Sequence, residues 1–166
     1  IAYGHVDRGE SIRTVHAAIA SGVNFFDTAD FYGFGESEAI LGDALAGSRS
    51  NVVLATKVGM LDGTGIQNFS ADHIQTSVED SLRRLRTDYI DLYQMHSPPR
   101  HELERDAIAV TLLDQLKKAG KIRAWGVSAR NPDDARFALS ELNLDAIQVN
   151  FNLLDHGVRQ PAQRFT

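Results

Sequence analysis

Cysteine is absent from the 166 residues, so the chain has no disulfide frame, thiolate nucleophile or cysteine-ligated zinc. No apolar run approaches the roughly 20 residues that a membrane-spanning helix needs, and we expect no signal peptide. Basic residues are in the minority, 17 Lys and Arg against 22 Asp and Glu, and the net charge is −5. This balance favours neither nucleic acid nor an anionic membrane as a partner. We therefore expect a cytoplasmic protein.

The composition that remains is typical of a folded globular chain. Hydrophobic residues make up 43%, aromatic residues 8% and charged residues 23% of the sequence, which is enough to bury a core. The length suits one domain, and no linker divides residues 1–166. His96 and His101 have no third ligand at a useful spacing, so we expect no metal site.

Short β-rich runs alternate five times with segments of helical spacing. The runs predicted as strands are 23–27, 52–57, 89–96, 124–128 and 146–150, and the helical faces are 12–19, 40–45, 74–85, 112–116 and 135–142. This alternation predicts an α/β fold in which parallel strands are joined by helices, as a doubly wound sheet or as a (β/α)₈ barrel. In both folds, ligands bind at the carboxyl ends of the strands.

Polar side chains stand at these predicted strand ends. They are Asp27, Lys57, His96, Ser128 and Asn150, with Gln148 two residues before the last. Taken alone, each is more simply a polar residue where a strand leaves the sheet. An acid, a cation and an imidazole at the same end of three successive parallel strands can instead converge on one point, so the set is a candidate active site.

The sequence around these residues resembles the aldo-keto reductase family. The segments that carry the resemblance are 26–33 (FDTADFYG), 55–59 (ATKVG), 91–99 (DLYQMHSPP), 120–123 (GKIR) with 126–128 (GVS), and 148–154 (QVNFNLL). They cover most of residues 4–157. The resemblance implies a (β/α)₈ TIM barrel and an NAD(P)H-dependent oxidoreductase that reduces a small aldehyde or ketone to an alcohol.

The same resemblance implies a role for each of four residues. Tyr32 is expected to donate the proton, and Lys57 to lower the pKa of the Tyr32 hydroxyl. Asp27 is expected to hold Lys57 charged, and His96 to orient the substrate oxygen. A free tyrosine, with a pKa of about 10, is a poor acid at neutral pH, and a nearby ammonium lowers that pKa by roughly one to three units.

Cofactor and substrate contacts are also implied. Ser128, Gln148, Asp27 and Asn150 are expected to bind the cofactor, with NADP(H) favoured and NAD(H) as the alternative. Phe31 and His96 are expected to face the substrate; Phe34 and Trp125 are further candidates for an apolar wall, although Trp125 suits the core better. Many relatives have Asn after the serine, where this chain has Ala129 and then Arg130, so one carboxamide contact is in doubt.

The length is short for this fold, since a complete barrel takes about 250 residues. We expect about five of the eight strand–helix units here, with one strand missing before Ile1 and two after Phe165. Such a partial barrel would expose unpaired strand edges. A homo-oligomer that covers these edges is compatible with the sequence. A non-catalytic, cofactor-binding regulatory or interaction subunit of the same fold is the alternative to an enzyme.

Overall fold

The computed structural model describes residues 7–105, 107–153 and 155–157. The strands are β1 (Phe25–Asp27), β2 (Val53–Val58), β3 (Ile90–His96), β4 (Ile122–Ser128) and β5 (Ala146–Gln148). The helices are α1 (Arg8–Ala20), α2 (Glu36–Ala44), α3 (Ala71–Leu85), α4 (Arg100–Arg105), α5 (Ala107–Lys118) and α6 (Pro132–Glu141), with a short 3₁₀ helix, η1 (Arg49–Asn51).

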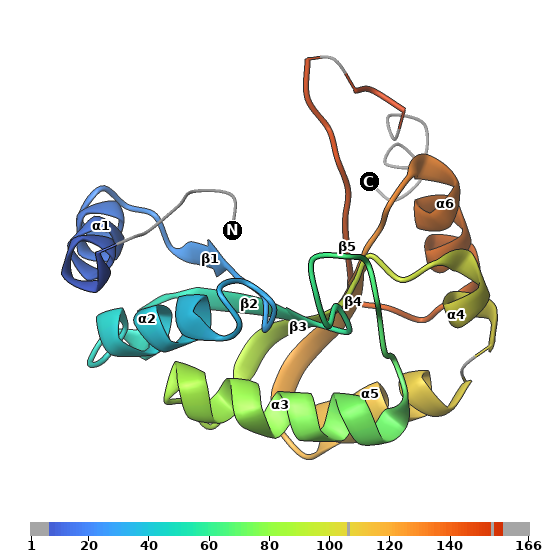
Figure 1. Ribbon diagram of the computed structural model, residues 1–166, viewed down its shortest axis with the longest axis horizontal. Helices are drawn as coiled ribbons and strands as arrows, with labels where there is room; N and C mark the ends of the chain where they lie inside the picture. The colour runs from blue at the N-terminus through green and yellow to red at the C-terminus, as the bar shows by residue number, and fades with distance from the viewer. Residues whose placement is uncertain (1–6, 106, 154, 158–166) are drawn as a thin grey trace.

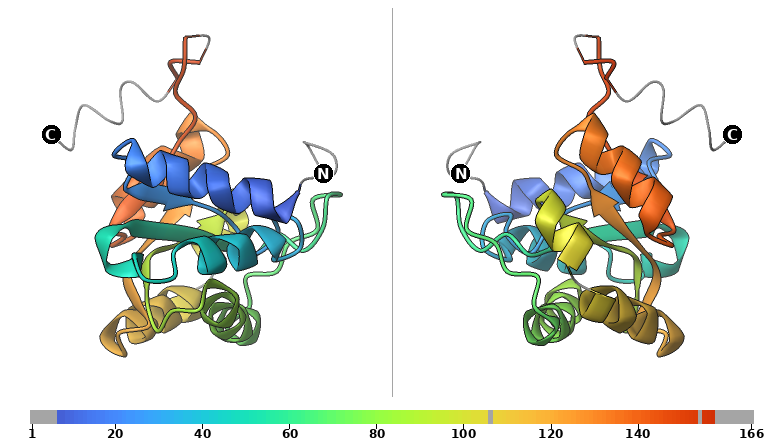
Figure 2. Two further views of the ribbon diagram at one scale, coloured as in Figure 1. Left: turned by 90° about the vertical axis from the view of Figure 1, so that its left-hand side faces the viewer. Right: turned by 90° about the vertical axis from the view of Figure 1, so that its right-hand side faces the viewer.

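The five strands form one parallel sheet in the order β1-β2-β3-β4-β5. A doubly wound sheet would reverse this order at a switch point, and here the order never reverses. The helices lie around the convex side of the curled sheet (Figures 1 and 2). Gln148 Nε2 on β5 lies 3.4 Å from Asp27 Oδ2 on β1, so the curl brings the first and last of these strands within reach. The arrangement is that of part of a (β/α)₈ barrel.

Local sequence signals explain where the helices begin. The Ser70 hydroxyl accepts a hydrogen bond from the His73 backbone N–H and caps α3. Asn131 Oδ1 accepts from the backbone N–H groups of Asp133 and Asp134, with Pro132 at the first helical position of α6. Both starts agree with the sequence pattern, as do the five predicted helices as a whole.

The structure differs from the prediction by one additional helix and by up to two residues at strand ends, including the starts of β1 and β4. Helix α4 was not expected, because its six residues contain one apolar side chain, Leu103, and therefore show no helical periodicity. Strand β5 ends at Gln148, two residues earlier than predicted, which leaves Asn150 in the loop beyond the strand.

The hydrophobic core fills the space between the sheet and the surrounding helices. The predicted face of α3 is buried, with Ile74, Val78 and Leu85 at most 2% exposed. Trp125 on β4 is fully buried, and its indole N–H donates to Asp114 Oδ1 on α5 at 2.9 Å. The expectation that Trp125 belongs to the core is thus confirmed. Within the described residues, no helix is both long and apolar enough to cross a membrane.

A charged side chain is also buried between the sheet and the surrounding helices. Glu38 on α2 is fully buried and accepts hydrogen bonds from Thr56 Oγ1 and Arg84 Nε, each at 2.6 Å. The guanidinium of Arg84 also packs over Gly35, where a Cβ atom would lie 2.7 Å from Arg84 Cδ. This ion pair therefore ties α2 to α3 and to the outer face of β2.

Replacing Arg84 by methionine tests the importance of the pair. Arg84→Met leaves the Glu38 carboxylate buried without its cation, and removal of one partner of a buried pair costs about 3 kcal/mol or more. Chemical denaturation should show that loss. Arg83→Met is the matched control, because Arg83 is 72% exposed and its surface pair with Asp80 contributes less than about 1 kcal/mol. Equal stability of the two variants would contradict this account of Glu38.

Candidate active site

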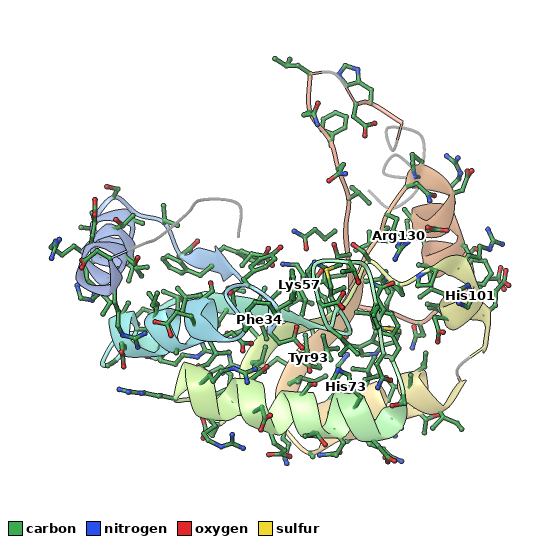
Figure 3. All side chains as sticks on the ribbon, in the orientation of Figure 1. Phe34, Lys57, His73, Tyr93, His101 and Arg130 are labelled. Atoms are coloured by element: carbon green, nitrogen blue, oxygen red, sulfur yellow. The ribbon has the colours of Figure 1, made fainter. Side chains whose placement is uncertain are left out.

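The register of the sheet brings the predicted polar residues onto one face, in two neighbouring rows. Lys57 pairs with Gln94, His96 with Ser128, and Ser128 with Gln148, each across one strand boundary. Because paired residues of parallel strands point to the same face, these side chains share the concave side at the carboxyl ends. Figure 3 shows Lys57 on the side of the sheet away from α3.

Lys57 is the most deeply buried charged group on this face. The residue is 1% exposed, and its ammonium donates to Asp27 Oδ2 at 2.5 Å and to the Thr28 carbonyl at 2.8 Å. A buried ammonium is tolerated only with such compensation. The structure therefore joins Asp27 to Lys57, as the sequence analysis expected.

Tyr32 lies beside this pair on the loop that follows β1. Its ring centroid is 5.2 Å from Lys57 Nζ, and its ring meets that of His96 edge-on with 5.7 Å between the centroids. The loop turns back immediately after Tyr32, with Gly33 at φ 61° and Gly35 at φ 93°, values that favour glycine. This tight turn aims Tyr32 at the concave face and leaves 40% of the residue exposed.

His96 is the fourth member of the cluster and is 8% exposed. Burial lowers the pKa of the imidazole to about 4, with a further lowering by the positive charge of Lys57 and an opposing effect from Asp27. The ring is therefore neutral near pH 7. A neutral imidazole can donate one N–H to a ligand oxygen while its other nitrogen accepts.

The expected cofactor residues separate into two places. Gln148 is exposed on the concave face and lies within 3.4 Å of Asp27, while Ser128 is half-buried beside His96 in the register. Asn150 instead lines a hollow between the loops after β4 and β5, together with Asp155. The structure thus gathers Gln148 and Ser128 with the Lys57 cluster and sets Asn150 apart.

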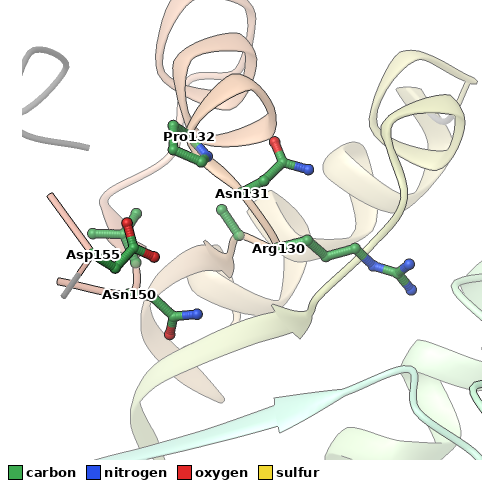
Figure 4. Close-up of a pocket in the computed structure, with 7 residues that line it drawn as sticks. Arg130, Asn131, Pro132, Asn150 and Asp155 are labelled. Carbon is green, nitrogen blue, oxygen red and sulfur yellow. The ribbon is translucent and has the colours of Figure 1, made fainter. Parts of the chain in front are cut away.

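Arg130 takes up the position where the sequence departs from the family pattern. Its guanidinium donates to the Ser97 carbonyl at 2.5 Å and to the side-chain oxygen of Gln67. Gln67 Nε2 in turn donates to the His96 carbonyl at 2.8 Å. In Figure 4 the Arg130 side chain extends away from Asn150. Arg130 therefore fastens the loop before α3 to the end of β3.

Phe31 and Phe34 line a hollow that is bordered by α3 and does not include Lys57. Their rings meet edge-on at 5.5 Å, and both line this hollow with Met60 and Leu61. Phe31 is half-buried and Phe34 is 72% exposed. The two rings can form the apolar wall beside the turn that carries Tyr32.

Sequence reasoning missed two residues that support the cluster. Gln67 holds the end of β3 from a distant loop, and no local pattern marks it. Gln94 bonds to Gln148 at 3.2 Å. Its signal was the two-residue spacing from His96, which places both on one face of the strand.

Comparison with known proteins identifies the origin of this arrangement. A sequence profile described as the aldo/keto reductase family matches residues 1–164. The chain belongs to that family.

Several members are similar to this aldo/keto reductase chain. Aldo-keto reductase YhdN of Bacillus subtilis (strain 168) is 40% identical over 164 residues, covering 95% of this chain and 48% of that protein. NADH-specific methylglyoxal reductase of Escherichia coli (strain K12) is 37% identical over 171 residues, covering 93% and 52%. A Klebsiella pneumoniae aldo/keto reductase, solved in complex with NADP and acetate, has a TM-score of 0.79 at 29% identity and covers 95% and 54%. The chain spans about half the length of these relatives.

One further carboxyl group of the aldo/keto reductase chain stands out near the cluster. Asp30 is half-buried, and its pKa is raised to about 7, first by burial and then by the nearby charge of Glu38, with Arg84 opposing. Its backbone N–H donates to the Lys57 carbonyl at 3.1 Å, so Asp30 belongs to the segment that wraps Lys57. The folded protein therefore holds a proton on Asp30 that an unfolded chain releases near pH 4.

This shift predicts a pH-dependent gain in stability from Asp30→Asn. Between about pH 4 and pH 7 the folded state binds more protons than the unfolded state, so stability from Asp30 is lost as the pH rises through 7. Asparagine cannot ionise, so the variant does not lose this stability as the pH rises. The melting temperature of the variant should exceed that of the wild type by several degrees at pH 8 and by much less at pH 5. Asp88→Asn, at an exposed position, should show no such difference between the two pH values.

Proposed function

We propose that this aldo/keto reductase chain carries the catalytic half of an NAD(P)H-dependent oxidoreductase that reduces an aldehyde or ketone to an alcohol. The observation that carries the proposal is the buried Lys57–Asp27 pair with the Tyr32 and His96 rings packed around it. Such a cluster at the carboxyl ends of parallel strands lies where barrel enzymes hold their chemistry. A non-catalytic subunit would have no need of it.

Tyr32 is the proposed proton donor. Adding a hydride to a carbonyl carbon leaves negative charge on the oxygen, which must receive a proton. The phenol of Tyr32 supplies that proton, and the Lys57 ammonium stabilises the tyrosinate that remains. Asp27 keeps Lys57 in place by its 2.5 Å contact. The exposed fraction of Tyr32 leaves its ring accessible to a small substrate.

His96 is the proposed group that orients the carbonyl. With its pKa lowered to about 4, the ring stays neutral and serves as a hydrogen-bond donor to the substrate oxygen instead of a competing acid. The ring lies edge-on against that of Tyr32, which supports the proposal that both groups contact the same oxygen. Phe31, beside the turn, is the proposed apolar contact.

The nicotinamide cofactor would supply the hydride. Its flat carboxamide has one acceptor and two donors, and Gln148 and Ser128 present complementary groups on the concave face, with Asp27 at the same place. The chemistry of this donor set fits the group. NADP(H) is favoured by the Klebsiella structure, while the NADH-specific Escherichia coli relative keeps NAD(H) as the alternative. Asn150 is proposed as a more distant contact, at the hollow after β5.

The remaining features of the whole protein stay predictions. These are a cytoplasmic location, a small-molecule carbonyl as partner, and a single partial barrel domain over residues 1–166.

Tyr32→Phe is the direct test of the proton donor. In the whole protein, we expect turnover with NADPH and a panel of aldehydes and ketones to fall about 10²–10⁴-fold, because positioned proton transfer is lost. NADPH affinity, measured by fluorescence, should stay within about threefold, since the ring remains. Tyr89→Phe, at the opposite end of β3 from His96, is the matched control and should keep wild-type turnover. Near-wild-type turnover of Tyr32→Phe with NADPH bound would refute the assignment.

Lys57→Met tests the cation. Losing Lys57 removes the charge that stabilises the tyrosinate and leaves the Asp27 carboxylate unpaired beside a buried site, so both turnover and melting temperature should fall. Lys118→Met, on the exposed end of α5, should change neither. A Lys57→Met protein that is as active and as stable as the wild type would remove the pair from the mechanism.

A further inference from the structure

The backbone carbonyl of His96 lies at a point where β2, on one side of β3, has already ended. Pairing with β2 stops at Met95, one residue before His96, whereas pairing with β4 continues through His96. Backbone groups of successive strand residues face opposite neighbours, and Ser97 N–H donates to the Ser128 carbonyl on β4, so the His96 carbonyl faces the β2 side. The donor that it receives there is a side chain, Gln67 Nε2, at 2.8 Å.

Gln67 therefore holds one end of the peptide group that follows His96. The other end, Ser97 N–H, donates to the Ser128 carbonyl at 2.9 Å. Ser97 has a φ of 52°, in the left-handed region that is unfavourable for a residue with a side chain. Its carbonyl accepts from Gln67 Nε2 at 3.1 Å and from Arg130 Nε at 2.5 Å. These hydrogen bonds stabilise a turn that the Ser97 backbone by itself disfavours.

The orientation of the Gln67 amide is fixed by partners on both of its polar atoms. The nitrogen donates to the carbonyls of His96 and Ser97, and the oxygen accepts from the guanidinium of Arg130, a group that has only donors. A reversed amide would place its oxygen against two carbonyl oxygens and its N–H groups against a cation. Only one orientation satisfies all three contacts, and Arg130 is itself held by its bond to Ser97.

The loop that carries Gln67, residues 59–69 (green in Figure 1), is closed without this side chain. The backbone of Gln67 pairs antiparallel with that of Met60. Asn68 N–H donates to the Gly59 carbonyl at 2.8 Å, and the Phe69 ring packs where a Cβ atom of residue 59 would lie. Backbone pairing and packing therefore shape the loop, which leaves the Gln67 amide available to the end of β3.

We propose that Gln67 is a positioning residue for His96, which aims the imidazole at the substrate oxygen by fixing the peptide group that follows it. The inference rests on the proposed function and deepens it, because it names the group that holds the orienting ring beside Tyr32.

The edge-on contact between the His96 and Tyr32 rings, with 5.7 Å between their centroids, depends on the direction of the His96 Cα–Cβ bond. That direction follows from the two peptide planes that flank the Cα atom. The first belongs to strand β3, and the second is the one that Gln67 fixes. A displacement of about 1 Å in a group that orients a substrate can cost about 10²-fold in rate.

Gln67→Glu separates this role from simple fastening of the loop. Glutamate has the same length and still pairs with Arg130, but it presents no N–H group to the two carbonyls. In the whole protein, with NADPH and the best substrate of the carbonyl panel, we expect kcat to fall about 10- to 100-fold. NADPH affinity should stay within about threefold. Gln115→Glu, the same exchange at an exposed site on α5, is the matched control and should keep wild-type turnover.

A second readout needs neither cofactor nor substrate. In an NMR spectrum, the nuclear Overhauser contact between the ring protons of Tyr32 and His96 should weaken severalfold in Gln67→Glu and persist in Gln115→Glu. Gln67→Met, which loses the donor without adding a charge, repeats both measurements should the glutamate variant melt early. Wild-type turnover of a folded Gln67→Glu protein, or an unchanged ring contact, would overturn the positioning role. A wild type that reduces no carbonyl would instead overturn the proposed function, while the ring contact would still decide the role of Gln67.

Discussion

The buried ion pair between Lys57 and Asp27 is the interaction around which this half of the barrel is organised. An ammonium that is 1% exposed requires a carboxylate and a carbonyl at hydrogen-bond distance, and Asp27 and Thr28 supply them from the neighbouring strand and its exit. Those two residues begin the segment that leads to Tyr32. The hydrogen bonds that the buried Lys57 ammonium requires therefore fix the start of the loop that carries Tyr32, the proposed acid.

The order of the sheet extends this constraint to the other residues. Because β1 to β5 follow one another without a reversal, successive segments of the chain bring their last residues to one end of the concave face. His96 and Ser128 pair directly, and Gln148 follows on the next strand. The curl of the sheet then brings Gln148 on β5 within 3.4 Å of Asp27 on β1.

The two faces of the sheet divide stability from chemistry. On the convex side, the Glu38–Arg84 pair is satisfied and tightly enclosed. On the concave side, the Gln94 oxygen has no hydrogen-bond partner within the part of the chain that the structure describes, and the pKa of His96 is lowered to about 4; both are unfavourable for folding alone. Asp30 lies between the two regions, with its pKa raised by the buried carboxylate on one side while its backbone supports Lys57 on the other. Functional sites commonly retain such unfavourable groups because their chemistry depends on them.

What the sequence determined by itself was the alternation of elements and the identity of the strand-end residues. Hydrophobic period and caps such as Ser70 and Asn131 are local, so they predicted α3 and α6 and the five strands. Helix α4 was not predicted because it has too few apolar residues to show a helical period. Strand β5 was predicted to run to Asn150, and it ends at Gln148, because no local signal marks the end of so short a strand. Tertiary structure alone decided which amides meet across the sheet. Gln94 reaches Gln148 across the intervening strand β4, and Arg130 meets Gln67 only because two distant loops fold together. Contacts between residues more than fifty positions apart depend on strand register and curl, and no local pattern encodes either one.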